Sequence, residues 1–267
     1  VIICQTLEDA VAGFTDMLQE SRFGNASEKV VIEEFLSGIE LSVFILTDGK
    51  HYVTLPEAKD YKKIGEGDTG PNTGGMGSVS PVPFADDAFM EKVSRQIILP
   101  TMNGLHAEGI DYKGFIFFGL ISVSGDPYVI EYNCRLGDPE TESVIPRINN
   151  DLVRLFQSAA EGSLNREIMS FDSRTATSVM LVSSGYPGSY EKGKLITGEE
   201  NVQGSMVFHA GTKMHPETGL TISDGGRVMA VTSLGATMEE ALLKSYGNIG
   251  KINFDGKNFR HDIGFDL

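Results

Sequence analysis

A short segment in the middle of the chain carries residue types that suit metal and phosphate chemistry. Glu131, Asn133 and Arg135 occupy alternate positions after an apolar and aromatic run. In a β-strand this spacing places all three side chains on one face. A carboxylate and an amide oxygen can ligate a Mg²⁺ ion that bridges phosphates, and a guanidinium can bind an anion beside it. The alternative is a strand face that is polar only because solvent covers it.

The residues after this predicted strand add further acids. Asp138, Glu140 and Glu142 follow one another at alternate positions in the run Gly-Asp-Pro-Glu-Thr-Glu. Ligands of α/β proteins bind beyond the carboxyl ends of strands, so these acids can bind a substrate amine or a second metal ion. They can equally open the next helix, because acids are favoured in a first helical turn.

A glycine-rich segment from Gly65 to Gly77 is a second candidate. Its backbone N–H groups can converge on an anion, since glycines allow close approach and positive φ angles. Lysines just before it supply positive charge. A disordered surface loop is the alternative, but a loop as long as residues 59–83 inside a compact domain is usually functional.

A third candidate lies earlier in the chain, where Glu33-Glu34-Phe35-Leu36 precedes Glu40. A strand end with free backbone groups can bind an adenine edge, and the carboxylate of Glu40 can accept hydrogen bonds from ribose hydroxyls. A solvated acidic strand end is the alternative reading. Neither a Ser/His/Asp nor a Cys/His arrangement is visible, so nothing in the sequence indicates covalent catalysis.

Composition limits the partners. The net charge is −15, which argues against nucleic acid as a partner, although a single nucleotide needs only a local pocket. No apolar run approaches the length of a membrane span, so no membrane partner is expected. Two cysteines do not make a disulfide framework,. We therefore expect a cytoplasmic protein.

Hydrophobic periodicity predicts a mixture of helices and strands that positions these candidates. The predicted helices cover residues 7–18, 85–108, 151–161 and 237–249. The predicted strands cover residues 1–4, 30–36, 39–47, 51–56, 113–122, 127–133, 176–183, 205–212, 221–223 and 226–234. Residues 59–83 are predicted to form a long loop. The predicted secondary structure changes from long elements to short strands and glycine turns near residues 165–175, where we place a domain boundary.

Taken together, the motifs resemble the phosphoribosylamine–glycine ligase family of the ATP-grasp superfamily. They are Glu33 to Glu40, Asp68 to Gly77, and Glu131 to Glu140, and the resemblance continues through Phe208 to Lys213, Gly225 to Val228 and Asp262 to Gly264. It implies an α+β fold of ATP-grasp type. Residues 1–37 would be the remainder of the small lobe, 38–170 the catalytic lobe, and 171–267 a small β-rich C-terminal domain.

The resemblance also implies an activity. ATP would phosphorylate glycine, and the amine of 5-phosphoribosylamine would displace phosphate from the acyl phosphate. Glu131 and Asn133 would bind Mg²⁺ or Mn²⁺, Glu33 to Leu36 and Glu40 would bind ATP, and Arg135 and Asp138 would be catalytic. Substrate contacts would come from Lys62, Asn72, Thr73, Gly74, Gly75, Asp138 and Glu140.

Two further expectations complete this interpretation. The family carries an N-terminal part that is absent here, so we expect the fragment alone to be inactive. We expect a monomer. The alternatives are another ATP-grasp carboxylate–amine ligase and a nucleotide-binding module without catalysis.

Overall fold

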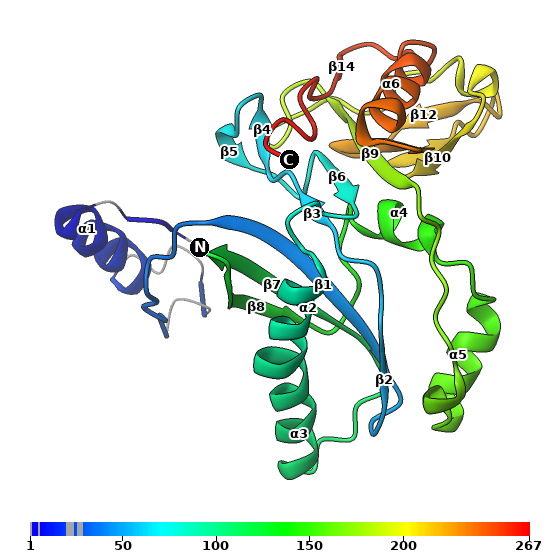
Figure 1. The fold of residues 1–267 in the computed structure, drawn as a ribbon. Coiled ribbons are helices and arrows are strands. Elements are labelled where there is room, and N and C mark those ends of the chain that lie inside the picture. The colour runs from blue at the N-terminus through cyan, green and yellow to red at the C-terminus, as the bar shows by residue number, and fades with distance from the viewer. Residues whose placement is uncertain (1, 5, 20–23, 26–28) are drawn as a thin grey trace. The chain divides into compact units, whose positions relative to one another are not determined.

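The computed structural model describes every residue except 1, 5, 20–23 and 26–28. Figure 1 shows the described elements along the chain. The chain separates into two compact units, residues 1–38 and residues 39–267. Each unit is described by itself. Among the described residues, no helix is both long and apolar enough to cross a membrane.

The first unit contains the predicted helix, α1 (Leu7–Leu18), which is confirmed. The hydroxyl of Thr6 accepts a hydrogen bond from the backbone N–H of Asp9 at 3.1 Å, as an N-cap residue does,. The predicted strands 1–4 and 30–36 are wrong where described: residues 2–4 and 30–36 form no strand, and Val1 lies outside the described part. The described residues of this unit contain no strand that could pair with them,.

The second unit begins with a four-stranded antiparallel sheet. Its order is β2 (Tyr52–Thr54), β1 (Ile39–Thr47), β7 (Gly114–Val123) and β8 (Asp126–Asn133). The strands predicted over residues 39–47, 51–56, 113–122 and 127–133 are confirmed, and they pair as two antiparallel hairpins. Ser124 and Gly125, with φ of 54° and 83°, form the tight turn between β7 and β8,.

The two faces of this sheet are covered differently. Leu41, Val43 and Ile45 of β1 point to one face and pack against a long helical segment. That segment consists of α2 (Asp87–Val93), a π-helical turn (Ser94–Ile98) and α3 (Leu99–Ala107). The helix predicted over 85–108 is therefore confirmed, with one irregularity. The N–H of Leu99 reaches back to the carbonyl of Ser94, just before Pro100, which has no N–H to donate,.

The opposite face of the same sheet is apolar at one end and polar at the other. Phe44 and Leu46 of β1 and Phe117 of β7 pack in a second core with Leu155 of α5 (Leu152–Glu161). Helix α5 was predicted, and Asp151 caps it by accepting from the N–H of Arg154 at 3.1 Å. Farther along the same face, Glu40 and Ser42 replace the apolar side chains,.

A second, six-stranded sheet carries the C-terminal strands. Its order is β10 (Ser205–His209), β13 (Arg227–Gly235), β9 (Thr175–Ser183), β6 (Gly77–Ser80) and β3 (Lys59–Asp60), and β14 (Lys257–Asn258) also pairs with β9. Helix α6 (Met238–Ile249), capped by Thr237, packs on β9 and β13 as Figure 1 shows. The sheet joins strands from both sides of residues 165–175, so the proposed boundary there remains a prediction.

The loop predicted over residues 59–83 is wrong in part. It contains β3 and β6, and between them a hairpin of β4 (Lys63–Gly65) and β5 (Thr69–Asn72). Gly77 of β6 pairs with Val179 of β9, far away in sequence. Because the partner is distant in sequence, local composition predicted only a long loop at this position.

The remaining elements are short. In the described part of residues 39–267 they include α4 (Thr141–Val144), 3₁₀ turns at Ile145–Arg147, Leu164–Arg166 and Glu199–Asn201, and the hairpin of β11 (Thr212–Met214) and β12 (Thr221–Ser223). The strand predicted over 205–212 therefore ends at His209, and Thr212 begins a different sheet. The other predicted C-terminal strands and the last helix are confirmed.

Candidate active site

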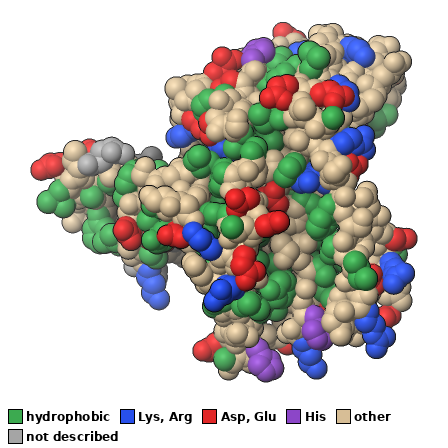
Figure 2. All heavy atoms as spheres, viewed as in Figure 1, with side chains coloured by type: hydrophobic (Ala, Val, Ile, Leu, Met, Phe, Trp, Pro, Cys, Tyr) green, Lys and Arg blue, Asp and Glu red, His purple; other side chains and the backbone are tan. Residues whose placement is uncertain are grey.

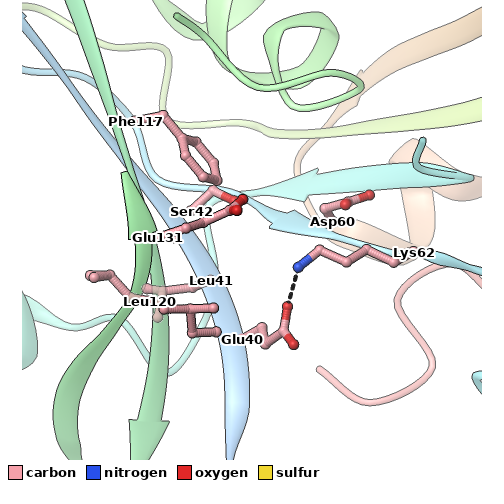
Figure 3. Close-up of a pocket in the computed structure, with 10 residues that line it drawn as sticks. Glu40, Leu41, Ser42, Asp60, Lys62, Phe117, Leu120 and Glu131 are labelled. Carbon is pink, nitrogen blue, oxygen red and sulfur yellow. Dashed lines mark hydrogen bonds and ion pairs between the residues drawn. The ribbon is translucent and has the colours of Figure 1, made fainter. Parts of the chain in front are cut away.

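A small hollow lies over the polar end of the first sheet, where β1, β7 and β8 run side by side (Figure 3). Its polar lining consists of Glu40, Ser42, Asp60, Lys62 and Glu131. Glu40 and Ser42 come from β1 and Glu131 from β8, whereas Asp60 and Lys62 come from the segment that leads into the glycine-rich residues. On the face drawn in Figure 2, acidic and basic side chains lie close together near the centre of the part formed by residues 39–267.

Strand register places Glu131 in this hollow. Ser42 pairs with Gly119, and Gly119 pairs with Glu131, so the three residues form one row across the sheet. A Cβ atom at Gly119 would lie only 3.0 Å from Cγ of Glu131. Because glycine has no Cβ, the Glu131 side chain has room at this position. Asn133 pairs with Phe117, two residues along β7. The prediction that Glu131 and Asn133 share a strand face is confirmed.

The same prediction is wrong for Arg135. Strand β8 ends at Asn133, so the period of two no longer applies when the chain reaches Arg135,. The Arg135 side chain is exposed, and its Nη1–H donates to the carbonyl of Leu136 at 2.9 Å. Its catalytic role stays a prediction.

Glu131 and Asn133 fit a hard divalent cation by their chemistry. Within the described residues, the carboxylate of Glu131 has no hydrogen-bond partner, and Nδ2 of Asn133 is buried without one. No contact there fixes which end of the amide faces outward. The described residues hold no group of three or more His, Cys, Asp or Glu side chains able to bind a metal. Two oxygen donors suit Mg²⁺, which normally takes its other ligands from phosphates and water.

Lys62 and Glu40 form an ion pair at the edge of the hollow. Nζ of Lys62 donates to Oε2 of Glu40 at 2.5 Å, as Figure 3 shows. Burial lowers the pKa of Lys62, but the carboxylates of Glu40, Asp60 and Glu131 outweigh this effect and raise it. Lys62 is therefore a fixed positive charge among acids.

Asp60 lines the hollow and is a candidate site residue that was not predicted from the sequence. Its Oδ1 is buried and has no hydrogen-bond partner among the described residues. Burial raises the pKa of Asp60 well above its usual value, and the negative charge of Glu140 adds to this. One sequence signal was available: Asp60 and Lys62 alternate in a short charged run before the glycines, which places both on one side of an extended chain,.

The glycine-rich segment is held against this charged run. The N–H and the hydroxyl of Thr73 donate to the carbonyl of Lys62 at 2.7 and 2.8 Å. The N–H of Gly75 donates to the hydroxyl of Thr73 at 2.9 Å. Gly75 has φ of 110°, and a Cβ there would lie 2.2 Å from Pro139 and 2.8 Å from Asp60. The segment is thus packed onto the Gly-Asp-Pro-Glu run, while Asn72 at the end of β5 is exposed.

The acids of the Gly-Asp-Pro-Glu run have partners inside the structure. The guanidinium of Arg227 binds the carboxylate of Asp138 with contacts of 2.8 and 2.7 Å. Glu140 is buried, and its Oε1 accepts from the hydroxyl of Ser42 at 2.7 Å. Burial raises the pKa of Glu140, although the Ser42 hydrogen bond opposes the rise.

Glu142 lies in the first turn of α4, as the helical reading of this acidic run predicted. Burial raises its pKa to about 7, and the charge of Asp138 contributes. The predicted substrate contacts of Asp138 and Glu140 stay predictions. The structure adds their unexpected partners, Arg227 and Ser42, to the site.

The predicted adenine residues belong to the other unit. Glu33, Glu34 and Phe35 are exposed, and Leu36 is half-buried. They fall within residues 1–38, so they are described without reference to the hollow. Their role in nucleotide binding stays a prediction.

Comparison with solved structures identifies the fold class. The biotin carboxylase domain of the Hydrogenobacter thermophilus 2-oxoglutarate carboxylase, solved with MgADP and bicarbonate, matches 96% of this chain and 55% of that one with a TM-score of 0.66 at 16% identity. This likeness concerns the fold alone. The sequence also matches a family described as phosphoribosylglycinamide synthetase, ATP-grasp (A) domain, over residues 1–141. The fold is therefore that of an ATP-grasp protein.

The particular family is shown as well. The C domain of phosphoribosylglycinamide synthetase matches residues 176–266. The chain belongs to the phosphoribosylglycinamide synthetase family.

Individual relatives agree with this assignment. The phosphoribosylamine–glycine ligase of Salmonella typhimurium is 44% identical over 99% of this chain and 62% of its own length. That of Escherichia coli K12 is 43% identical with the same coverage. The crystal structure of the Thermotoga maritima enzyme matches 98% of this chain and 64% of that one, with a TM-score of 0.86 and 36% identity. The chain thus spans less than two thirds of the length of these relatives.

Proposed function

We propose that the full-length protein joins glycine to 5-phosphoribosylamine at the expense of ATP, giving glycinamide ribonucleotide, ADP and phosphate. The relatives named phosphoribosylamine–glycine ligase support this proposal. The observation that carries it is the meeting of three segments. Gly75 of the glycine-rich segment packs on Pro139 of the Gly-Asp-Pro-Glu run, beside Asp60, which lines the same hollow as Glu131.

Glu131 and Asn133 would hold the divalent cation in this reaction. A bound Mg²⁺ or Mn²⁺ neutralises charge on a transferring phosphoryl group. Lys62 brings a positive charge to the same hollow, and Arg135, exposed just beyond β8, can bind the phosphate or acyl oxygens as charge develops,. These roles follow the chemistry of each side chain and its place near β8.

The remaining residues would bind the two organic substrates and the nucleotide. The amide-forming step needs water to be kept away, because an acyl phosphate hydrolyses. The glycine-rich segment can serve this purpose, since its backbone lies directly against the acids of the site. Glu40 would accept from ribose hydroxyls, and residues 33–36 would contact adenine.

Phosphate release by the full-length protein tests the proposal. Release should require ATP, a divalent cation, glycine and 5-phosphoribosylamine together, because the acyl phosphate forms productively only when the amine can consume it. Mass spectrometry should identify glycinamide ribonucleotide as the product. Release that ignores 5-phosphoribosylamine but responds to a different amine would contradict the proposed acceptor. Nucleotide binding without any phosphate release would instead indicate a nucleotide-binding module without catalytic activity.

A further inference from the structure

Arg227 connects two segments of the candidate site that are distant in sequence. It begins β13, and one guanidinium nitrogen donates to Oδ1 of Asp138 at 2.8 Å while the other donates to Oδ2 at 2.7 Å. The nitrogen bound to Oδ1 also donates to the carbonyl of Gly74 at 2.5 Å. This bidentate geometry fixes the plane of the carboxylate, which a single point charge cannot do.

The backbone around Arg227 is itself held in place. Arg227 pairs with Val182 of β9, and its carbonyl accepts from the N–H of Gly211 at 2.9 Å. Its neighbour Gly226 lies under the ring of Tyr186, where a Cβ would approach the ring to 2.2 Å. The arginine therefore reaches into the site from a rigid strand end.

Gly74 receives a contact at each of its peptide groups from this C-terminal region. Its N–H donates to the hydroxyl of Tyr186 at 2.9 Å, and its carbonyl accepts from Arg227. A Cβ at Gly74 would lie 3.0 Å from Cζ of Arg227, so a glycine is needed for the guanidinium to pass. Tyr186 and Arg227 thus hold the glycine-rich segment, and Arg227 holds Asp138 as well.

The pair leaves Asp138 able to bind something else. The Arg227 side chain is 20% exposed, but that of Asp138 is 54% exposed. Each carboxylate oxygen uses one lone pair for Arg227 and keeps another as an acceptor. A carboxylate with a fixed plane and free lone pairs suits a cationic donor such as the ammonium group of an amino acid. The neutral amine of a nucleophile has less need of a charged partner.

We infer that Arg227 is a positioning residue, which orients the carboxylate of Asp138 to bind the ammonium group of glycine and holds Gly74 beside it. This inference rests on the proposed function for its substrate. Its structural half, the hold on Gly74 and Asp138, does not depend on that function. Kinetic constants test the substrate half, and hydrogen exchange tests the structural half.

Four variants of the full-length protein test the inference: Arg227→Lys, Arg227→Met, Asp138→Asn and the double variant Arg227→Met with Asp138→Asn. Arg227→Lys keeps the positive charge but cannot form the two parallel hydrogen bonds of the guanidinium to the carboxylate. We expect Arg227→Lys and Asp138→Asn each to raise the KM for glycine by about tenfold or more, with the KM for ATP changed by less than about twofold. The double variant should be no worse than the worse single variant, because both changes remove the same contact.

Arg174→Lys is the matched control. Arg174 forms a comparable fork on the surface, with Nε donating to Oδ1 of Asp172 at 3.0 Å and Nη2 donating to Oδ2 at 2.6 Å. It should leave all kinetic constants unchanged. Kinetics like those of wild type in Arg227→Lys and Arg227→Met would overturn the substrate half of the inference, as would equal changes in the constants for ATP and glycine.

Hydrogen exchange decides the structural half even if wild type proves to have no ligase activity. Amides of residues 74–76 should exchange faster in Arg227→Met and Arg227→Lys than in wild type, and Arg174→Lys should not change them. Unchanged exchange in both Arg227 variants would overturn the claim that this arginine holds the segment. A wild type that shows no glycine-dependent phosphate release would contradict the proposed function, while the exchange result would still stand.

Discussion

Strand β8 and the run that follows it carry similar polar side chains in different circumstances. On β8, Glu131 is exposed and Asn133 has a buried amide nitrogen without a partner in the described structure. In the run after the strand, Asp138 is bound by Arg227 and Glu140 by Ser42. Unpaired groups beside a hollow are available to a ligand. A group with a partner inside the protein also stabilises the fold, and Asp138, whose side chain is 54% exposed, can do both.

This difference predicts which side chains contribute to folding stability and which to ligand binding. The buried carboxylate of Glu140, bound to the hydroxyl of Ser42, stabilises one arrangement of the chain, and removing its partner leaves a costly unsatisfied group,. An exposed carboxylate contributes little to folding. The paired region consists of residues 137–142 with the segments packed on them. The open region consists of β8 and the exposed side chains that line the hollow, including Lys62. We expect substitutions in the paired region to change stability and substitutions in the open region to change activity, whereas Asp138, which is exposed as well as paired, should affect both.

The largest effect on stability should come from Gly75→Ala, which breaks the packing of the paired region. Gly75 has φ of 110°, and a Cβ would lie 2.2 Å from Pro139. Strain and overlap together should lower the free energy of unfolding by about 2–4 kcal/mol. Thermal unfolding of the full-length protein measures this.

Gly67→Ala is the matched control for that substitution. Gly67 also has a positive φ, of 62°, but nothing lies within 4 Å of its would-be Cβ. Its cost should be limited to about 1–2 kcal/mol of left-handed strain. Equal losses for the two variants would show that packing on Pro139 contributes nothing.

A smaller effect should follow from Glu142→Gln, and it should depend on pH. Burial raises the pKa of Glu142 from 4.5 to about 7. The neutral acid therefore contributes stability that is complete below pH 4.5 and is lost as the pH rises to about 7,. Glutamine stays neutral, so the variant should gain about 1–3 kcal/mol over wild type above that window and little below it.

Chemical unfolding across that pH range measures the difference between the variant and wild type. Glu108→Gln serves as control, because Glu108 is exposed at the end of α3. A difference that does not change with pH would mean that Glu142 titrates alike in the folded and unfolded protein.

The smallest effect on stability should come from Lys62→Met in the open region. The side chains of Lys62 and Glu40 are 44% and 47% exposed, and exposed pairs contribute little,. We expect a change below about 0.5 kcal/mol in unfolding, together with a weaker apparent affinity for ATP. Lys92→Met, which removes the exposed pair with Asp126, should match it in stability but not in nucleotide affinity. A large loss of stability would place Lys62 in the paired region.

The sequence predicted the open region better than the paired one. Alternation alone correctly placed Glu131 and Asn133 on one face, because the period of two holds for as long as the strand lasts. It failed for Arg135, since the end of the strand after Asn133 depends on the chain that follows. The same limit applied to residues 30–36, whose composition favours a strand but whose described surroundings in the first unit provide no strand to pair with.

The paired region depends on contacts that are distant in sequence. Asp138 and Arg227 are separated by 89 residues, and Ser42 and Glu140 by 98. No local period relates such residues, so their pairing could not be predicted from spacing. The glycine-rich segment was predicted to be functional, and that role stays a prediction. The strands β3 and β6 on either side of it were not predicted, because β6 is held by pairing with the distant β9 and β3 by pairing with β6. Asp60 was missed because its importance comes from burial, which only the folded chain creates.

One paired measurement on Glu131→Gln tests the division most directly. Phosphate release with ATP, Mg²⁺, glycine and 5-phosphoribosylamine, and the midpoint of thermal unfolding, should be measured on the same preparation of full-length protein. The account predicts a loss of release of about 10³-fold or more, with an unfolding midpoint like that of wild type. Substantial release by the variant, or a loss of activity that accompanies an equally clear loss of stability, would contradict it.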